Sequence, residues 1–351
     1  METFHITCDD GTIGWGEPVV EGRAQTVETA VKDPRDIEKH WQAIYRGTFY
    51  RNGPILTSAL SGIEQALWDI LGKHLKVPVW RLLGGKVRDR VRMYGWLSLE
   101  PTGDYIDLFC KNINENKEGF TAYKTCPLPA MQMIEQPYVL HQIVDNVTLL
   151  RNKIDKRIDI ALDFHGRSTP IMSRRLAHMI EDLDIMFIEE PVLPGDVNAL
   201  KQISSSTTIP VATGERLFTR WQFNEVIEQQ AVAIIQPDIS HCGGINEAKK
   251  IAAMAEARNI AVAPHCPLGP ISLAACLQFA TCTWNFLCQE HLTLGSDYLV
   301  TPFQVIDGYV NVSELPGLGI EVADDKLTAG LFNGDWETPQ FRLKDGSFAE
   351  W

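Results

Sequence analysis

The chain has 351 residues, with 45 acidic and 32 basic side chains, a formal net charge of −13 and 45% hydrophobic residues. This length and composition are typical of a globular protein with a large core, and they exclude a disordered or fibrous chain. The acidic balance argues against nucleic acid or an anionic membrane as a partner. No apolar run approaches the ~18–20 residues that a membrane helix needs.

The first twelve residues have neither the basic nor the apolar region of a secretory signal peptide. The eight cysteines include no Cys-x-x-Cys pair. In a chain this large they are typical of buried thiols in a reducing compartment, and a disulfide framework is the weaker interpretation. We therefore expect a cytoplasmic protein.

Residues 1–86 combine a strand-like beginning with helical patterns. The segment 4–17 predicts a β-hairpin with Asp10 and Gly11 at its turn. In 54–75 apolar residues recur at steps of one, three and four, which predicts an amphipathic helix with one wide apolar face and Pro54 in its first turn. We interpret 1–86 as the N-terminal part of a capping domain.

From residue 87 to 292 short apolar, often β-branched runs alternate with helical patterns. Alternation of this kind is typical of a parallel sheet, and eight strands in about 200 residues favour a closed barrel. We expect an α/β fold, a (β/α)7β barrel resembling the TIM barrel, with residues 293–351 returning to the α+β capping domain. The predicted strands are 91–97, 122–128, 158–164, 185–191, 209–215, 231–238, 260–266 and 285–291.

An acidic residue or a histidine ends each predicted strand from the third onward. These residues follow one another at intervals of 23 to 27 positions, about the length of one β/α unit, and they are Asp163, Glu189, Glu215, Asp238, His265 and Glu290. Each taken alone could be a helix cap or a surface charge. Six in register predict an active site at the carboxyl end of the barrel, where barrel enzymes place their chemistry.

Three of these residues predict a metal site. Asp163, Glu189 and Glu215 would converge from adjacent strands, and carboxylates without a thiolate or close imidazole suit Mg²⁺, although Mn²⁺ uses the same ligand type. Without a cation, three clustered carboxylates would repel one another and raise each other's pKa.

The histidines predict acid–base chemistry. His165 lies two residues after Asp163, so strand alternation would turn it into the same cavity as a general acid; the alternative is a loop residue beyond the strand. Asp238 beside His265 would fix the imidazole tautomer and make His265 a general base. Glu290 would hydrogen-bond the substrate or form a salt bridge on the rim.

Other polar residues carry weaker signals. Glu190 points away from Glu189 if the strand continues, so we interpret it as structural and paired to a base. Lys124 ends the second predicted strand and would either face the substrate carboxylate or cap the barrel. His241, in the run Ser-His-Cys-Gly-Gly, is more typical of a turn than of a catalyst.

The motifs resemble the mandelate racemase subgroup of the enolase superfamily, and within it the dehydratases that act on D-galactonate. The resemblance extends over most of the chain. Its carriers are GWGEPVVEGRA (14–24), FYRNGPIL (49–56), LDFHGR (162–167), FIEEPVLP (187–194), TGERLF (213–218), QPDISHCGGI (236–245), APHCPLGPISLAAC (263–276) and the terminal AEW.

The resemblance implies a hydro-lyase that converts an aldonate, D-galactonate first, into a 2-keto-3-deoxy acid. Asp163, Glu189 and Glu215 would hold one Mg²⁺. His265 with Asp238 would remove the C2 proton, giving an enediolate, while His165 would protonate the leaving 3-hydroxyl. Glu290 would stabilise the intermediate by a hydrogen bond. It also implies a homo-oligomer, a dimer or an octamer.

The sequence departs from the subgroup at two places. Racemases carry Lys-x-Lys on the second strand, whereas here Cys126 stands at the second lysine position, which disfavours a two-base racemase. The N-terminal cap looks shortened at its start, between Val31 and Trp41, and after Asp297, so the lid over the substrate would be reduced. The alternatives are therefore dehydration or epimerisation of another C5 or C6 aldonate, or a lid-deficient, non-catalytic relative.

Overall fold

A computed structural model describes residues 4–17, 33–47, 49–97, 103–323 and 340–350. The predicted hairpin is present: β1 (Phe4–Thr7) and β2 (Ile13–Gly16) are antiparallel, with Phe4 opposite Gly16. Gly11 adopts a φ of +82° in the turn, a conformation that costs glycine little because it has no Cβ. Residues 18–24 of the motif 14–24, and the first two residues of the stretch between Val31 and Trp41 that was expected to be shortened, lie outside the described residues.

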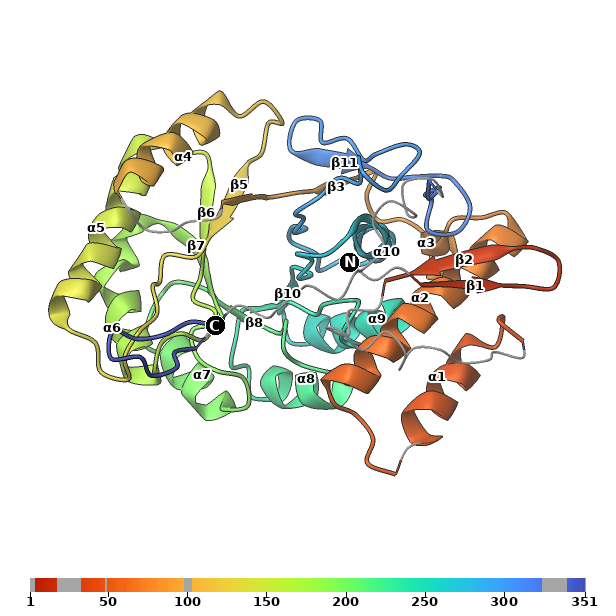
Figure 1. The fold of residues 1–351 in the computed structure, drawn as a ribbon, viewed down its shortest axis with the longest axis horizontal. Helices are drawn as coiled ribbons and strands as arrows, with labels where there is room; N and C mark the ends of the chain where they lie inside the picture. Colours follow the sequence, from red (N-terminus) through yellow and green to blue (C-terminus); the bar gives the residue numbers. More distant parts are fainter. Residues whose placement is uncertain (1–3, 18–32, 48, 98–102, 324–339, 351) are drawn as a thin grey trace.

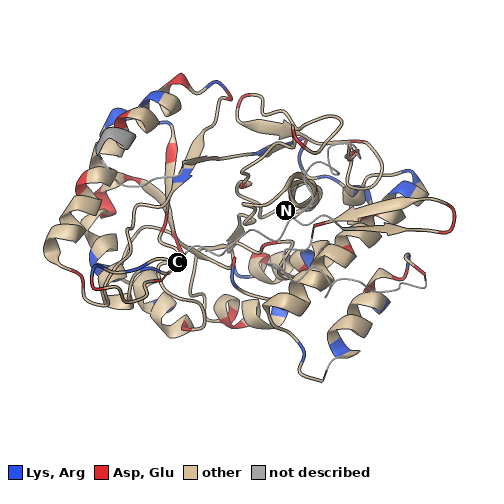
Figure 2. Cartoon of the chain, in the orientation of Figure 1, with Lys and Arg blue, Asp and Glu red and all other residues tan. Residues whose placement is uncertain are grey.

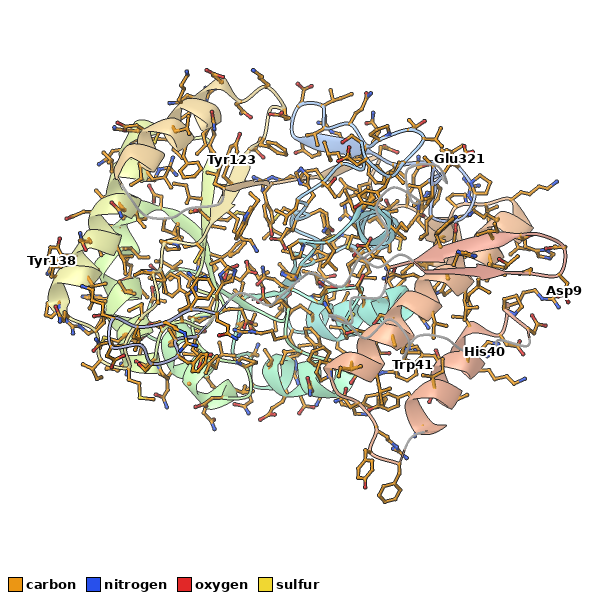
Figure 3. All side chains as sticks on the ribbon, in the orientation of Figure 1. Asp9, His40, Trp41, Tyr123, Tyr138 and Glu321 are labelled. Atoms are coloured by element: carbon orange, nitrogen blue, oxygen red, sulfur yellow. The ribbon has the colours of Figure 1, made fainter. Side chains whose placement is uncertain are left out.

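Two helices complete this side of the molecule, α1 (Ile37–Gly47) and α2 (Pro54–Leu75), with Pro54 in the first turn of α2 as predicted. The prediction of one apolar face on α2 is wrong, because every residue from 57 to 67 is buried. The helix packs between β2 and the loop that enters α9, so its polar side chains are covered too. Trp41 of α1, labelled in Figure 3, donates its indole N–H to the Gly243 carbonyl in the same loop at 2.8 Å.

The centre of the molecule is a parallel sheet in the order β10-β9-β8-β7-β6-β5-β4. Its helices follow one another around the outside, with β1, β2, α1 and α2 at one side (Figure 1). The strands are β4 (Gly95–Leu97), β5 (Ala122–Thr125), β6 (Asp159–Asp163), β7 (Ile185–Glu189), β8 (Val211–Thr213), β9 (Ile234–Ile235) and β10 (Ala261–Val262). The helices are α3 (Val79–Leu82), α4 (Gly103–Glu115), α5 (Pro137–Lys153), α6 (Pro170–Met179), the 3₁₀ turn η2 (Glu181–Leu183), α7 (Val197–Ser204), α8 (Thr219–Glu228), α9 (Ile245–Glu256) and α10 (Pro270–Thr281).

The eighth predicted strand, 285–291, closes the barrel without forming a regular strand. Leu287 donates its N–H to the Val262 carbonyl at 2.8 Å on one side. On the other side Gln289 donates to Arg92 at 2.9 Å and accepts from Tyr94 at 3.1 Å. Residues 285–289 therefore lie between β10 and the start of β4 and join the two edges of the sheet.

The first predicted strand, 91–97, is divided into β3 (Arg90–Arg92) and β4. The strand β3 leaves the barrel to pair with β11 (Tyr309–Asn311) in antiparallel register. Further along, the C-terminal segment meets the other side of the molecule, where Val79 donates to Gly317 and Leu318 donates to the Asp69 carboxylate. Residues 340–350 lie near α6 and α7 (Figure 1), with the Arg167 guanidinium 4.8 Å from the centre of the Phe341 ring.

The barrel interior is filled in layers that follow the two-residue period of a strand. One cluster is apolar and buried, and it consists of Tyr94, Ala122, Ala161, Phe187, Ala212, Ile234, Ala263 and Cys288. Two positions further along each strand the residues change character, to Trp96, Lys124, Asp163, Glu189, Gly214, Gln236, His265 and Glu290. An apolar floor thus lies directly beneath the predicted polar site.

Charges on the outside are mixed. Residues of both signs occur along α4 and α5 (Figure 2). Among the described residues no helix has both the length and the apolar character needed to span a membrane.

Candidate active site

The three predicted metal ligands come together. Asp163 and Glu189 end β6 and β7 and are register partners, and Glu215 follows β8 by two residues. One oxygen from each carboxylate lies within 4.8 Å of the others. Asp163 and Glu189 are buried, and Glu215 is partly accessible, so the cluster opens toward one side.

Lys124 occupies the centre of this cluster rather than the barrel rim. Its Nζ lies 2.8 Å from a Glu189 oxygen, 2.8 Å from a Glu290 oxygen and 3.5 Å from an Asp163 oxygen, and the side chain is fully buried. Its ammonium also stands 4.9 Å from the Trp96 ring, a cation–π contact. In this state Lys124 is the principal counter-charge of the carboxylates.

Burial and mutual repulsion disfavour the ionised carboxylates, and the positive charge of Lys124 offsets this cost only in part. Burial raises the pKa of Glu189, and the neighbouring Asp163 raises it further. Burial also raises the pKa of Glu215. Burial acts the same way on Asp163, but Lys124 and His165 outweigh it and hold the pKa of Asp163 below its usual range. Three convergent oxygen ligands that still carry this electrostatic cost fit a hard divalent cation such as Mg²⁺ or Mn²⁺.

His165 reaches the cavity, although not by strand alternation. The strand ends at Asp163, and His165 has a φ of +50°, in the left-handed region that few residues other than glycine adopt. Its N–H donates to Asp163 Oδ1 at 2.9 Å, and its ring Nε2 lies 2.9 Å from Asp163 Oδ2. A tight turn capped by the Asp163 carboxylate, not a continued strand, directs the imidazole toward the metal cluster.

The protonation of His165 is set by its neighbours. Burial alone lowers its pKa, but hydrogen bonds and charge from Asp163 and Cys126 outweigh burial and raise the pKa of His165 to about 10. With no cation on Asp163, these contacts favour the protonated imidazole, the form that can give up a proton.

Asp238 and His265 form the expected dyad. Asp238 Oδ2 lies 2.8 Å from His265 Nδ1, and Asp238 Oδ1 accepts the Ser240 N–H at 2.7 Å. Because Nδ1 is engaged by the carboxylate, Nε2 is the nitrogen that faces the cluster, 3.3 Å from Glu215 Oε2. Burial lowers the pKa of His265, but the carboxylates of Glu215, Glu290 and Asp238 prevail and raise it well above its usual value.

Glu290 is an interior residue and not part of a rim salt bridge. One oxygen pairs with Lys124 and the other accepts the Cys266 N–H at 2.8 Å. Against the effect of burial, Lys124 and His265 lower the pKa of Glu290. The carboxylate thus bridges the second strand and the loop that follows His265.

The weaker candidates have structural contacts. Glu190 pairs with Arg216 at 2.5 Å and accepts the Gly214 N–H, which agrees with a structural role. His241 lies in a turn, with Nδ1 2.6 Å from the Ser58 hydroxyl. Cys126, at the second lysine position of racemases, has its sulfur 3.5 Å from Arg167 Nη1.

Sequence reasoning missed two residues that share the polar layer. Trp96 lies beside Lys124, and its ring centre is 6.3 Å from that of His165. Gln236 is fully buried, and neither amide atom has a hydrogen-bond partner among the described residues. Both lie two positions after a residue of the apolar floor, Trp96 after Tyr94 and Gln236 after Ile234. The two-residue period of a strand is therefore the signal that would have identified them.

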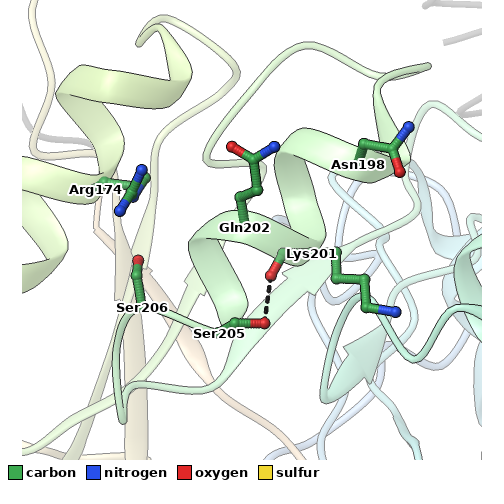
Figure 4. Close-up of a pocket in the computed structure, with 6 residues that line it drawn as sticks. All are labelled: Arg174, Asn198, Lys201, Gln202, Ser205 and Ser206. Atoms are coloured by element: carbon green, nitrogen blue, oxygen red, sulfur yellow. Dashed lines mark hydrogen bonds between the residues drawn. The ribbon is translucent and has the colours of Figure 1, made fainter.

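A surface hollow elsewhere does not belong to this site. It lies between α6 and α7 on the outside of the barrel (Figure 4), and no member of the polar layer contributes to it. Its lining residues are Arg174, Asn198, Lys201, Gln202, Ser205 and Ser206.

Two family models match the chain. The mandelate racemase/muconate lactonizing enzyme N-terminal domain matches residues 2–84, and the enolase C-terminal domain-like model matches residues 110–326. The second match includes every candidate ligand and acid–base residue described above.

Curated relatives are similar over nearly the whole chain. D-galactonate dehydratase of Variovorax paradoxus is 43% identical across 99% of this chain and 95% of the relative, and that of Klebsiella pneumoniae is 42% identical with the same coverage.

Solved structures share the fold. An enolase from Agrobacterium radiobacter, bound to Na and L-malate, has a TM-score of 0.91 and 28% identity over 99% of this chain and 95% of that one. An enolase superfamily member from Salmonella Typhimurium has a TM-score of 0.86 and 28% identity over 93% of each chain. The chain therefore belongs to the mandelate racemase/muconate lactonizing enzyme family of the enolase superfamily.

Proposed function

We propose that this protein is a Mg²⁺-dependent sugar-acid dehydratase that converts an aldonate, D-galactonate first, into a 2-keto-3-deoxy acid. The observation that carries the proposal is that two imidazoles contact different carboxylates of one cluster. His165 contacts Asp163, and His265 contacts Glu215. Dehydration needs one base and one acid, and the two imidazoles provide them. The D-galactonate dehydratases at 42–43% identity support this reaction class.

Asp163, Glu189 and Glu215 would hold the metal, since their oxygens converge and their buried charges are not fully compensated. A divalent cation bound there would stabilise the negative charge that develops on the substrate carboxylate when the neighbouring carbon loses its proton. The bound L-malate in the Agrobacterium relative is also a 2-hydroxy acid, which supports a hydroxy-acid substrate class.

The protein's own residues account for the proton transfers. His265 in its neutral form takes the C2 proton at Nε2 and the C2–H electron pair enters the enediolate, while the Nδ1–H stays on the ring and donates to Asp238. His165 gives its proton to the 3-hydroxyl as the C3–O bond breaks, so one molecule of water leaves. The enol that remains tautomerises to the 2-keto-3-deoxy acid. Glu290 would support the intermediate by a hydrogen bond.

Cys126 favours dehydration over epimerisation. A C2 epimerase needs a proton donor on each face of the substrate, and at this position the thiol replaces the second lysine of the racemases. The described residues at the end of β5 therefore offer no second lysine base.

The test is a panel of C4–C6 aldonates assayed for 2-keto-3-deoxy acid with Mg²⁺ or Mn²⁺. His265→Asn and His165→Asn are assayed alongside in D₂O. We expect both to lose turnover by roughly 10²- to 10⁴-fold, with deuterium still entering C2 in His165→Asn but not in His265→Asn. A folded, metal-binding protein that dehydrates no member of the panel would refute the proposal and favour a non-catalytic relative.

A further inference from the structure

A closed ring of hydrogen bonds joins the N-terminal hairpin and α2 to the barrel. Glu17, which follows β2, donates its N–H to Gln65 Oε1 at 3.0 Å, and Gln65 Nε2 donates to Ser240 Oγ at 3.1 Å. The Ser240 hydroxyl bonds the Ser272 hydroxyl at 2.9 Å, and the Ser272 N–H returns to Glu17 Oε2 at 3.0 Å. All four residues are at most 1% exposed, so no bond in the ring competes with solvent.

The ring holds the Asp238–His265 dyad from both sides. On the Asp238 side, the Ser240 N–H occupies Oδ1 and leaves Oδ2 for His265. On the His265 side, Glu17 accepts the N–H groups of Gly269, which ends the loop that begins after His265, and of Ser272 in the first turn of α10. The dyad therefore lies between two loops that are fixed to one carboxylate from the hairpin.

We propose that Glu17 is a positioning residue for proton abstraction, which acts on His265 and Asp238 through the ring. Proton transfer depends on the position of the imidazole, and a misplacement of ~1 Å can cost about a hundredfold in rate. Glu17 does not touch the substrate. It fixes the loop that follows His265. The imidazole is therefore aligned for proton abstraction only when the N-terminal region is docked on the barrel. The inference rests on the proposed function.

Glu64 provides a matched control. It also belongs to the N-terminal region, and its carboxylate accepts the N–H groups of Ile245 and Asn246 at 2.7 and 2.9 Å where α9 begins. Burial raises the pKa of Glu17 and of Glu64 to about 7 alike. Substitution by glutamine removes one acceptor and the buried charge at either site, but only Glu17 belongs to the ring.

The experiment compares Glu17→Gln with Glu64→Gln in kcat, KM and the primary isotope effect of a C2-deuterated substrate. We expect Glu17→Gln to lower kcat roughly 10- to 100-fold, to leave KM within about twofold and to enlarge the isotope effect, because proton removal becomes more limiting. Glu64→Gln should keep kcat within about threefold. Equal losses in both variants, or a loss in neither, overturn the inference.

A second variant covers the case in which Glu17→Gln does not fold. Ser272→Ala removes only the hydroxyl that links the ring and leaves the backbone donor to Glu17 in place. We expect it to lower kcat about fivefold, the effect of one hydrogen bond. An unchanged kcat and isotope effect in Ser272→Ala would contradict the proposed role.

A structural measurement separates this inference from the proposed function. If the wild type dehydrates no aldonate, the proposed function fails, and crystal structures of the two glutamate variants then decide the inference. A displaced 266–269 loop or a longer distance from His265 Nδ1 to Asp238 Oδ2 in Glu17→Gln alone supports it. An unchanged dyad in both variants overturns it.

Discussion

The ammonium group of Lys124 compensates the negative charge of a carboxylate cluster that could also bind a metal ion. Its ammonium contacts Glu189 and Glu290 and lies near Asp163, all of them buried. A buried charge without a partner is costly, and this cost is larger than the net gain from forming the pair. The carboxylates therefore depend on Lys124 until a metal ion adds its own charge.

The first prediction concerns this dependence. We expect Lys124→Met to lower the free energy of unfolding in EDTA by about 3–5 kcal/mol, because two buried carboxylates lose their counter-charge. Added Mg²⁺ should restore more stability in the variant than in the wild type. Urea unfolding with EDTA or with Mg²⁺ measures both effects.

The control for Lys124→Met is Lys250→Met, which breaks a partly exposed ion pair with Glu38. Exposed pairs contribute about 0–1 kcal/mol, so this variant should stay close to the wild type under both conditions. A Lys124→Met protein that is as stable as the wild type in EDTA would show that the carboxylates find their compensation elsewhere.

The residue scale also shows what the sequence could and could not predict. The spacing of Asp163, Glu189 and Glu215 was informative because one β/α unit has a nearly constant length. The inward position of Lys124 was left open because strands of a parallel barrel are buried on both faces, so apolar alternation does not reveal which side faces the axis. His165 was placed in the right cavity for the wrong reason, since its turn depends on a left-handed backbone conformation that spacing does not encode.

At the scale of elements, the crossing of β2 over α2 depends on glycines. A Cβ at Gly16 would overlap the Gly62 carbonyl oxygen, and one at Gly14 would overlap the Ala66 carbonyl oxygen. These are backbone atoms of a helix and cannot move aside alone. The close approach allows Glu17, the next residue after Gly16, to reach the start of α10.

The second prediction follows from that crossing. Gly16→Ala should lower the free energy of unfolding by at least about 2 kcal/mol, because the added methyl group forces β2 away from α2. Thermal or urea unfolding measures the loss. Gly47→Ala is the control, since it lies in α1 with open space around it and should be neutral or stabilising by up to ~1 kcal/mol. Equal stability of the two variants would argue against a tight crossing.

The helix α2 marks the limit of pattern-based prediction at this scale. Its bounds follow from Pro54 and the apolar spacing, yet the polar residues Gln65 and Asp69 are as buried as the apolar ones. Their partners are distant in sequence: Gln65 bonds Ser240, 175 residues away, and Asp69 bonds Leu318, 249 residues away. No local pattern contains such contacts, so the docking of the N-terminal region became visible only in the fold.

At the scale of the whole molecule, buried carboxylates join the N-terminal region to the barrel. Glu17 meets the start of α10 and Glu64 the start of α9, and the Asp69 carboxylate accepts from both Trp15 and Leu318. Burial raises the pKa of all three carboxyl groups, because it removes water from the ionised form. The backbone N–H groups that donate to them lower the pKa but do not fully offset burial. Among the described residues, the charges that act most on these pKa values are Asp238 on Glu17, Glu247 on Glu64 and Lys73 on Asp69.

The third prediction is a pH dependence of stability from this contact. The pKa of Glu64 is about 7 in the folded protein, against an ordinary value of 4.5 for an exposed glutamate, so the folded state binds the proton more tightly. Its contribution to stability is therefore fully present below pH 4.5 and is lost as the pH rises through 7. Glu64→Gln cannot titrate, so the free energy of unfolding of the wild type relative to Glu64→Gln should fall by on the order of 3 kcal/mol between pH 5 and pH 8.

Urea unfolding at pH 5, 6, 7 and 8 measures this difference, because groups common to both proteins cancel. Glu228→Gln, at the exposed end of α8, controls for the loss of a surface carboxylate. A pH-independent difference for Glu64→Gln would mean that the Glu64 carboxylate titrates as if exposed, and that the N-terminal region does not bury it in solution. A falling difference would mean that alkaline pH weakens the contact between the N-terminal region and the start of α9.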